Sequence, residues 1–173
     1  MRVYLDTEFT RFTQPQLISI GMAAEDGREF YAVSKSFSFK QCSAFVRNVV
    51  LPIIEHGPTA ALDRRELQAS LKQWLKDSAE PVDIVCDFDV DAELLLELID
   101  GQNDLRLREF NVGGVSVLSG DEYAEIAEGI DAYFAQPRQW PRHHALEDAR
   151  ALRHACAGSN VGTQRDAGAA HHG

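Results

Sequence analysis

The sequence has few cysteines, and it lacks long apolar runs. Its three cysteines, at positions 42, 86 and 156, form no Cys-x-x-Cys pair. This odd and scattered set excludes a disulfide framework and is typical of a reducing compartment. No apolar run approaches about 18 residues, and the first residues lack the apolar core of a signal peptide, so we expect no membrane span. Together these absences predict a cytoplasmic protein.

Basic residues are also few: 17 Lys and Arg stand against 27 Asp and Glu, a formal charge of −10. Broad electrostatic binding of nucleic acid normally needs a basic face. We therefore expect any nucleic-acid substrate to be short or gripped at one end. The length of 173 residues, 45% of them hydrophobic, suits one domain with a sizeable core. We place that domain at residues 1–158 and expect a disordered tail over 159–173, which has little to bury.

Strands and helices can be placed from hydrophobic periodicity and breaker residues. An Asp-Gly turn at 26–27 predicts a hairpin between the second and third strands. The order of elements predicts an α/β fold with a mixed central sheet flanked by helices. We expect strands at 2–5, 17–24, 29–33, 82–86 and 112–118, and helices at 39–54, 63–77, 92–99, 121–134 and 144–157.

Two acids lie at the end of the first strand, in the segment Leu-Asp6-Thr-Glu8. Because successive side chains of a strand alternate, Asp6 and Glu8 share one face and Thr7 lies on the other. Two neighbouring carboxylates repel each other, and a divalent cation removes that cost. A solvated edge strand with an accidental acid pair fits the same pattern, so the spacing alone leaves both interpretations open.

A second acidic group, Asp87-Phe-Asp89-Val-Asp91, joins an apolar strand to a helix. One aspartate at such a junction commonly caps the helix, and we expect Asp89 to do so. Three acids exceed what a cap needs, and sites gather at strand ends in open α/β sheets. We therefore expect at least one of these three acids to have a functional role.

A third acid, Asp148, lies on the apolar stripe of the last helix, where it needs a partner because burying a lone carboxylate is costly. That partner could be Arg150, in an ion pair, or a residue of a neighbouring helix. His143 lies five residues earlier, about 140° away around a continuous helix, so both side chains cannot serve one site from within it. Pro141 favours a loop or first-turn position for His143, from which its ring can reach the same site.

The segments Asp6-x-Glu8, Asp91 after a strand, and His143-x-Ala-Leu-x-Asp148 together resemble the DEDD superfamily of 3′–5′ exonucleases, in the subclass with a catalytic histidine that includes ribonuclease T and oligoribonuclease. The opening stretch is similar to a bacterial subgroup of small 3′-exoribonucleases. The resemblance covers residues 1–157. The middle motif departs from it, because Asp87 stands where relatives often carry Asn. The resemblance implies that Asp91 is the functional acid, and a slip of one helical turn would make it Asp87 instead.

The resemblance implies a ribonuclease H-like fold and a homodimer. It also implies two divalent cations, Mg²⁺ or Mn²⁺, about 4 Å apart. Such hard ions suit the carboxylates present, and no Cys/His cluster offers a zinc site. Asp6 would bridge both cations, with Glu8, Asp91 and Asp148 as further ligands. His143 would take the proton of the attacking water, and the products would be nucleoside 5′-monophosphates.

The implied substrate is single-stranded RNA or a short oligoribonucleotide. Phe9 and Phe12 are candidates for stacking on its terminal base, and Thr10 for contacting its terminal sugar or phosphate. Three alternatives remain. They are a single-stranded DNA exonuclease, a non-catalytic binding module of the same fold, and an acidic protein that holds structural Ca²⁺. The binding module predicts the loss of an acid or of His143, and all five positions are filled.

Overall fold

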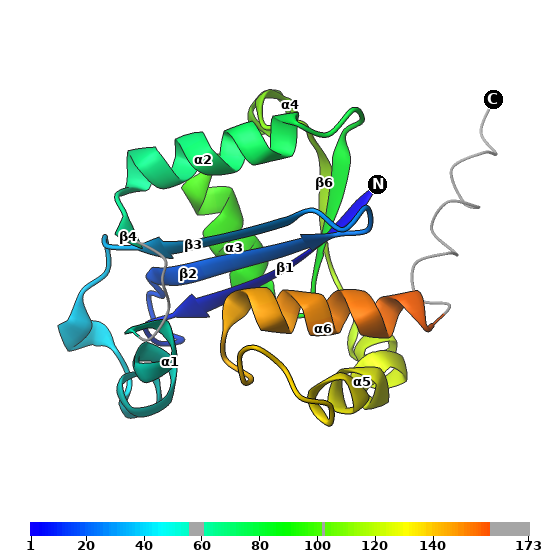
Figure 1. Cartoon of the computed structure of the whole chain (residues 1–173). Helices are drawn as coiled ribbons and strands as arrows, with labels where there is room; N and C mark the ends of the chain where they lie inside the picture. Colours follow the sequence, from blue (N-terminus) through cyan, green and yellow to red (C-terminus); the bar gives the residue numbers. More distant parts are fainter. Residues whose placement is uncertain (56–60, 102, 160–173) are drawn as a thin grey trace.

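The computed structural model describes residues 1–55, 61–101 and 103–159 (Figure 1). Its strands are β1 (Arg2–Phe9), β2 (Leu17–Ala24), β3 (Glu29–Ser34), β4 (Ala61–Leu62), β5 (Val82–Cys86) and β6 (Val112–Val117). Its helices are η1 (Phe39–Gln41), η2 (Val46–Val50), α1 (Leu51–Glu55), α2 (Arg64–Lys76), α3 (Asp89–Leu98), α4 (Asp104–Glu109), α5 (Gly120–Phe134) and α6 (Ala145–Ala157). Within these residues no helix combines the length and the apolar character needed to cross a membrane.

The six strands form one mixed sheet in the order β4-β3-β2-β1-β5-β6. β2 pairs antiparallel with β1 and β3, while the other pairings are parallel, so β2 alone among these strands runs against the rest. This mixed α/β sheet, with β1 at its centre between the hairpin and the parallel strands, is consistent with a ribonuclease H-like fold, and it confirms the predicted fold class.

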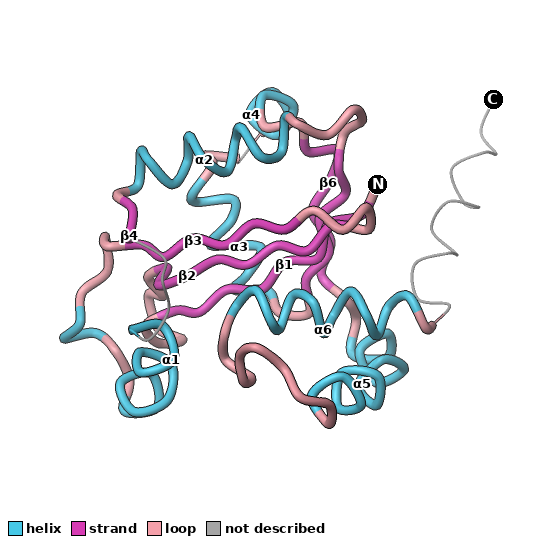
Figure 2. Tube along the Cα trace, in the orientation of Figure 1, coloured by secondary structure: helices cyan, strands magenta, loops and turns pink. Residues whose placement is uncertain are grey.

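Helices cover both faces of the sheet (Figures 1 and 2). On one face α2 and α3 bury Leu67, Leu71 and Leu95 against the odd-numbered side chains of β1, among them Leu5. On the other face α5 and α6 pack against Tyr4. Since side chains alternate along β1, Asp6 and Glu8 lie on the face of α6 and Thr7 lies on the face of α3.

α6 lies unusually close to the sheet because β2 has a glycine where the helix begins. A Cβ atom at Gly21 would lie 2.2 Å from the backbone carbonyl carbon of Ala145 and from the backbone nitrogen of Leu146. Gly21 is also the cross-strand partner of Asp6. The missing side chain therefore brings the first turn of α6, and Asp148 with it, beside Asp6.

Further contacts of α6 are ionic. Arg150 donates hydrogen bonds to Glu29 of β3 and to Glu147, and Arg153 donates to the carbonyl oxygen of Ala24. Glu147, which is buried, also accepts a hydrogen bond from the hydroxyl of Tyr133 in α5. These contacts fix α6 to the hairpin and to α5.

The helix predicted over 39–54 is wrong in its details. η1 ends at Gln41, and the continuous helix begins at residue 44, where the hydroxyl of Ser43 accepts the Val46 N–H. It then passes through the π-helical turn η2 and continues beyond Pro52, where we expected it to end. A proline normally interrupts a helix because it has no N–H to donate to the α-helical hydrogen bonds. The wider π turn before Pro52 changes the pattern of these bonds, and the helix continues past the proline.

Other features also differ from the expectations. α3 begins at Asp89, earlier than predicted, and its N-cap is Phe88, so Asp89 is an exposed first-turn residue and not the cap. α4 was not predicted, because it has only six residues and its clearest signal is the Asn103 side chain accepting the Arg106 N–H. The predicted tail lies, apart from Ser159, outside the described residues.

Candidate functional site

The acids singled out from the sequence lie together in one cavity at the end of β1. The cavity has a volume of about 770 Å³, within the range of ligand-binding pockets. The carboxylates come from β1, from the loop after β5, from α3 and from α6. The residues that line the cavity are Asp6, Thr7, Glu8, Phe9, Arg11, Phe12, Ser43, Phe45, Val46, Asp87, Phe88, Asp91, Tyr123, His143 and Asp148.

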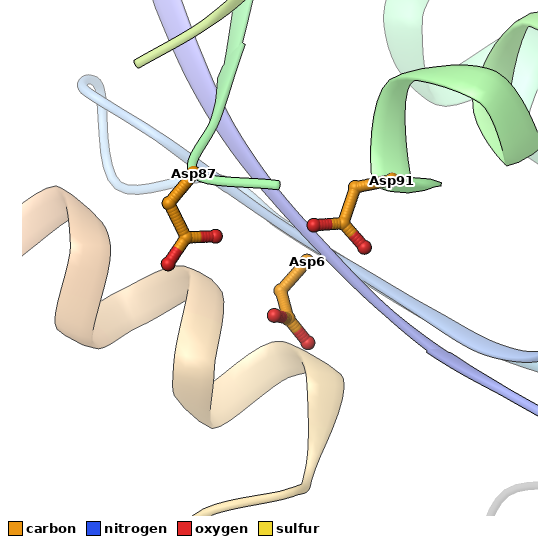
Figure 3. A group of neighbouring side chains, drawn as sticks. All are labelled: Asp6, Asp87 and Asp91. Carbon is orange, nitrogen blue, oxygen red and sulfur yellow. The ribbon is translucent and has the colours of Figure 1, made fainter. Parts of the chain in front are cut away.

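The acids form two groups that share Asp6. In one, carboxylate oxygens of Asp6, Asp87 and Asp91 all lie within 4.8 Å of one another; in the other, so do those of Asp6, Glu8 and Asp148. Figure 3 shows the first group, whose three side chains come from β1, the β5–α3 loop and α3 and lie beside one another. Each group supplies three hard oxygen ligands, so the site can hold divalent metal ions.

Hydrogen bonds hold two of the acids in place. Asp91 Oδ1 accepts the backbone N–H of Thr7 at 3.0 Å and its hydroxyl at 2.5 Å. Asp148 Oδ2 accepts the backbone N–H of His143 at 2.7 Å. Since the remaining carboxylate oxygens are not engaged by these donors, the acids are oriented without being neutralised.

The charges of these acids are poorly compensated within the protein. Burial, followed by the charges of Asp91 and Asp148, raises the pKa of Asp6 well above its ordinary value. Burial, again joined by neighbouring acids, raises the pKa of Glu8 to about 8 and those of Asp91 and Asp148 to about 7. Among the described residues, no Lys, Arg or His side chain forms an ion pair with any of these carboxylates.

Asp6 gives the clearest sign of a missing partner. Its Oδ2 atom is buried, and it has no hydrogen-bond partner in the part of the chain that the structure describes. Buried polar atoms are normally satisfied, and one left alone calls for an explanation such as an ion. Because Asp6 belongs to both carboxylate groups, a cation in either group would satisfy it.

His143 lies at the rim of the same cavity, in the loop before α6. Its backbone has a positive φ of 69°, a conformation that non-glycine residues rarely adopt. Its N–H bond to Asp148 and the edge-on contact of its ring with Phe45, at 4.9 Å, hold it there. Burial, together with the nearby Arg142 charge, lowers the pKa of His143, so its ring is neutral and able to accept a proton near pH 7.

The aromatic candidates form part of a larger cluster on the cavity wall. Phe9 and Phe88 stack at 6.4 Å, and the ring of Phe12 meets both edge-on at 5.4 and 5.9 Å. Phe12 is 75% exposed, which leaves most of its ring free for contact with a ligand. Phe45, which the periodicity places on an apolar helix stripe, is instead half exposed beside His143.

Thr10 does not fit its expected role. Its side chain is fully buried and does not line the cavity. Its hydroxyl accepts the Gln16 N–H, and its carbonyl oxygen accepts the Ser43 N–H, so Thr10 ties the β1–β2 loop to the segment before η2. A small hydroxyl residue beside an acidic motif looks the same in sequence whether it serves a loop or a ligand.

Two residues of the cavity were missed or left open in sequence. Asp87 was only the alternative to Asp91, but both lie in the first carboxylate group, so the choice between them does not arise. Tyr123 of α5 also lines the cavity, although its helical spacing is that of a core residue. The acidic character of the 87–91 segment was a usable signal for Asp87, and we find none for Tyr123.

Fold and site together define an α/β protein with a ribonuclease H-like sheet and a carboxylate-lined cavity that can hold metal ions. No known protein-family model matches the chain. Two curated proteins of Mycobacterium tuberculosis, from strains CDC 1551 and H37Rv, are each named 3′–5′ exoribonuclease and are each 38% identical to it over 88 residues. The match covers 49% of this chain and 52% of each relative, so the chain spans about half the length of the curated relatives it matches.

Proposed function

We propose that this protein is a metal-dependent 3′–5′ exoribonuclease that hydrolyses RNA ends or short oligoribonucleotides to nucleoside 5′-monophosphates. The observation that carries the proposal is the position of Asp6, shared by two carboxylate groups and left with a buried, unpartnered oxygen. The names of the two relatives support the same activity.

The residues present fit a pair of Mg²⁺ or Mn²⁺ ions. Asp6 would contact both, Asp91 and Asp87 would complete one site, and Glu8 and Asp148 the other. Bound there, the cations would supply charge neutralisation at the phosphate and activation of a water molecule. Both groups offer carboxylate oxygens only, which suits these ions better than zinc.

His143 is the proposed general base. It is the histidine on the cavity rim, and its lowered pKa keeps the ring neutral, as a proton acceptor at neutral pH must be. Phe12, with Phe9 and Phe88 behind it, offers a stacking surface for a base, which binds any nucleotide without reading its identity. The metal site and this aromatic wall lie in one cavity, so a terminal nucleotide can contact both.

The activity can be tested with 5′-labelled single-stranded RNA and Mn²⁺ or Mg²⁺. The wild type should shorten the RNA from its 3′ end, and Asp6→Asn should lose at least roughly 1,000-fold in rate, since several kcal/mol of charge stabilisation disappear. Asp89→Asn is the matched control, an exposed acid two residues from Asp91 that should retain activity. A wild type that leaves the RNA intact would reject the proposal.

The role of His143 needs a separate variant. His143→Asn keeps a residue that tolerates the left-handed backbone, so the loop should hold its shape. We expect it to bind metal as the wild type does and to lose about 10²- to 10⁴-fold in turnover. Full turnover in this variant would remove the general base from the scheme.

The choice of RNA over DNA rests on the resemblance and on the names of the relatives. Side-by-side digestion of matched RNA and DNA homopolymers separates the exoribonuclease from a single-stranded DNA exonuclease. A protein that binds either polymer without shortening it is the non-catalytic module. One that takes up Ca²⁺ and does neither holds a structural ion.

We also propose a homodimer in the cytoplasm. The dimer rests on the resemblance alone, and sedimentation at several protein concentrations would test it. The cytoplasmic location is supported by the cysteines at positions 42, 86 and 156, all free and buried.

A further inference from the structure

The cavity must accept an anionic phosphodiester although five of the residues that line it are acidic. Hydrogen-bond donors among its side chains are few, and some of them already have partners within the protein. The hydroxyl of Thr7 donates to Asp91, and Arg11 donates to the carbonyl oxygen of Thr13 and to Gln41. Bound cations can neutralise the carboxylates, but a phosphate oxygen facing away from the cations still needs a donor.

Tyr123 is the side chain placed to be that donor. It projects from α5 into the cavity with 38% of its surface exposed. Its backbone N–H bonds to Ser119 within the helix, but its hydroxyl makes no hydrogen bond to any described residue. A free phenol in a polar cavity has one donor hydrogen to offer to a ligand.

The charged residues around Tyr123 are mostly acids. After burial, the Asp87 charge is the largest influence that raises the pKa of Tyr123, with smaller contributions from Asp131 and Asp148, while Arg142 acts in the opposite direction. A raised pKa keeps the phenol protonated across the neutral range, so it retains a hydrogen to donate. The backbone N–H of His143 bonds to Asp148, which belongs to the second carboxylate group.

We propose that the hydroxyl of Tyr123 donates a hydrogen bond to a non-bridging oxygen of the scissile phosphodiester. This inference rests on the proposed exoribonuclease activity and adds a substrate-binding residue to it. Tyr123 forms no covalent bond to the substrate and transfers no proton. Its hydroxyl holds the phosphate in place while His143 takes the proton of the attacking water.

The test uses Tyr123→Phe on a ribodinucleotide, whose single phosphodiester is the scissile one. Hydrogen bonds to charged groups predict a loss of about 10-fold or more in kcat/KM. Removing one oxygen from a partly exposed ring should leave the melting temperature and Mn²⁺ binding unchanged. Tyr4→Phe, which removes the same atom from a buried ring outside the cavity, is the matched control and should keep wild-type kinetics.

Phosphorothioate dinucleotides separate a direct contact from an indirect one. Each diastereomer replaces one non-bridging oxygen with sulfur, which accepts a hydrogen bond poorly. The diastereomer that replaces the oxygen bound by Tyr123 should therefore slow the wild type more than it slows Tyr123→Phe, which has already lost that hydrogen bond. Equal slowing of both proteins by each diastereomer, or a dinucleotide kcat/KM within about twofold of wild type, would overturn the role of Tyr123. A wild type inactive on every RNA would reject the exoribonuclease itself, so the two failures can be told apart.

Discussion

Glu147 and Asp148 are consecutive residues of α6, and the protein treats their charges in opposite ways. Glu147 is buried beside a cation: Arg150 bonds to it at 3.0 Å, and the Tyr133 hydroxyl donates to it. Asp148 faces the cavity, where its nearest charged neighbours include the carboxylates of Asp6 and Glu8. It accepts a hydrogen bond from the backbone N–H of His143.

The same contrast extends beyond these two residues. Around Glu147, Arg150 and Arg153 also pair with Glu29, and hydrogen bonds from Arg150 lower the pKa of Glu29. Around Asp148, burial and repulsion raise the pKa of Glu8 to about 8. The chain therefore has arginines to neutralise buried acids where the fold requires it. The lack of such arginines around the cavity acids supports the proposal that a bound cation supplies their counter-charge.

The sharpest way to break this comparison is to neutralise each acid of the pair. Asp148→Asn keeps an oxygen for the His143 N–H and removes one repelling charge, so the metal-free protein should become more stable at pH 8, by roughly 1 kcal/mol. Its exonuclease rate should fall by roughly 1,000-fold or more. Melting curves without metal and RNA digestion with Mn²⁺ provide the two measurements.

Glu147→Gln is the matched control, and it should show the opposite pattern. It weakens a charge-assisted contact with Arg150, so the free energy of unfolding should fall by about 1–2 kcal/mol. Activity per folded molecule should remain close to wild type. If both variants changed stability in the same direction, the two environments would not differ as described.

Gly21→Ala should give the next largest effect. The added Cβ overlaps the backbone at the start of α6, so the helix must shift and carry Asp148 and His143 away from Asp6. We expect a loss of about 100-fold in rate, as a displacement of about 1 Å can cause. Gly120→Ala, where a Cβ meets nothing within 4 Å, should leave the rate unchanged. Equal rates for Gly21→Ala and Gly120→Ala would show that catalysis does not depend on the position of α6.

The smallest effect is on stability, and it depends on pH. A carboxyl whose folded pKa is raised binds more protons in the folded than in the unfolded state, so stability falls as pH rises from about 4 to the folded values near 7 and 8. The metal-free protein should lose stability across this window. Saturating Mn²⁺ should restore roughly 5–10 °C of melting temperature at pH 8 and much less at pH 5. Asp6→Asn should show no such gain.

Local patterns were enough to predict most of the scaffold. Alternation and turn residues place the strands of the hairpin, and the capping box of Asp63 and Glu66 marks the start of α2 as observed. The acids were identified because a carboxylate is conspicuous on a strand or an apolar stripe. Which faces of those elements meet was inferred from the family pattern and not from any local rule.

The walls of the cavity were harder to predict. Phe45 and Tyr123 have the helical spacing of core residues, and whether such a ring is covered depends on what packs over it. Likewise Thr10 follows an acidic motif, which suggests that it contacts a ligand. In the structure it is buried and makes hydrogen bonds with Gln16 and Ser43 instead. These outcomes depend on tertiary contacts between distant segments, which short-range periodicity does not report.

The central claim is that cations from outside the chain compensate these acids, with Asp6 common to both sites. Calorimetric titration of the metal-free protein with Mn²⁺ tests this most directly. We predict two Mn²⁺ ions bound per wild-type chain, one for Asp87→Asn and none for Asp6→Asn. Undiminished Mn²⁺ binding by Asp6→Asn would contradict the account.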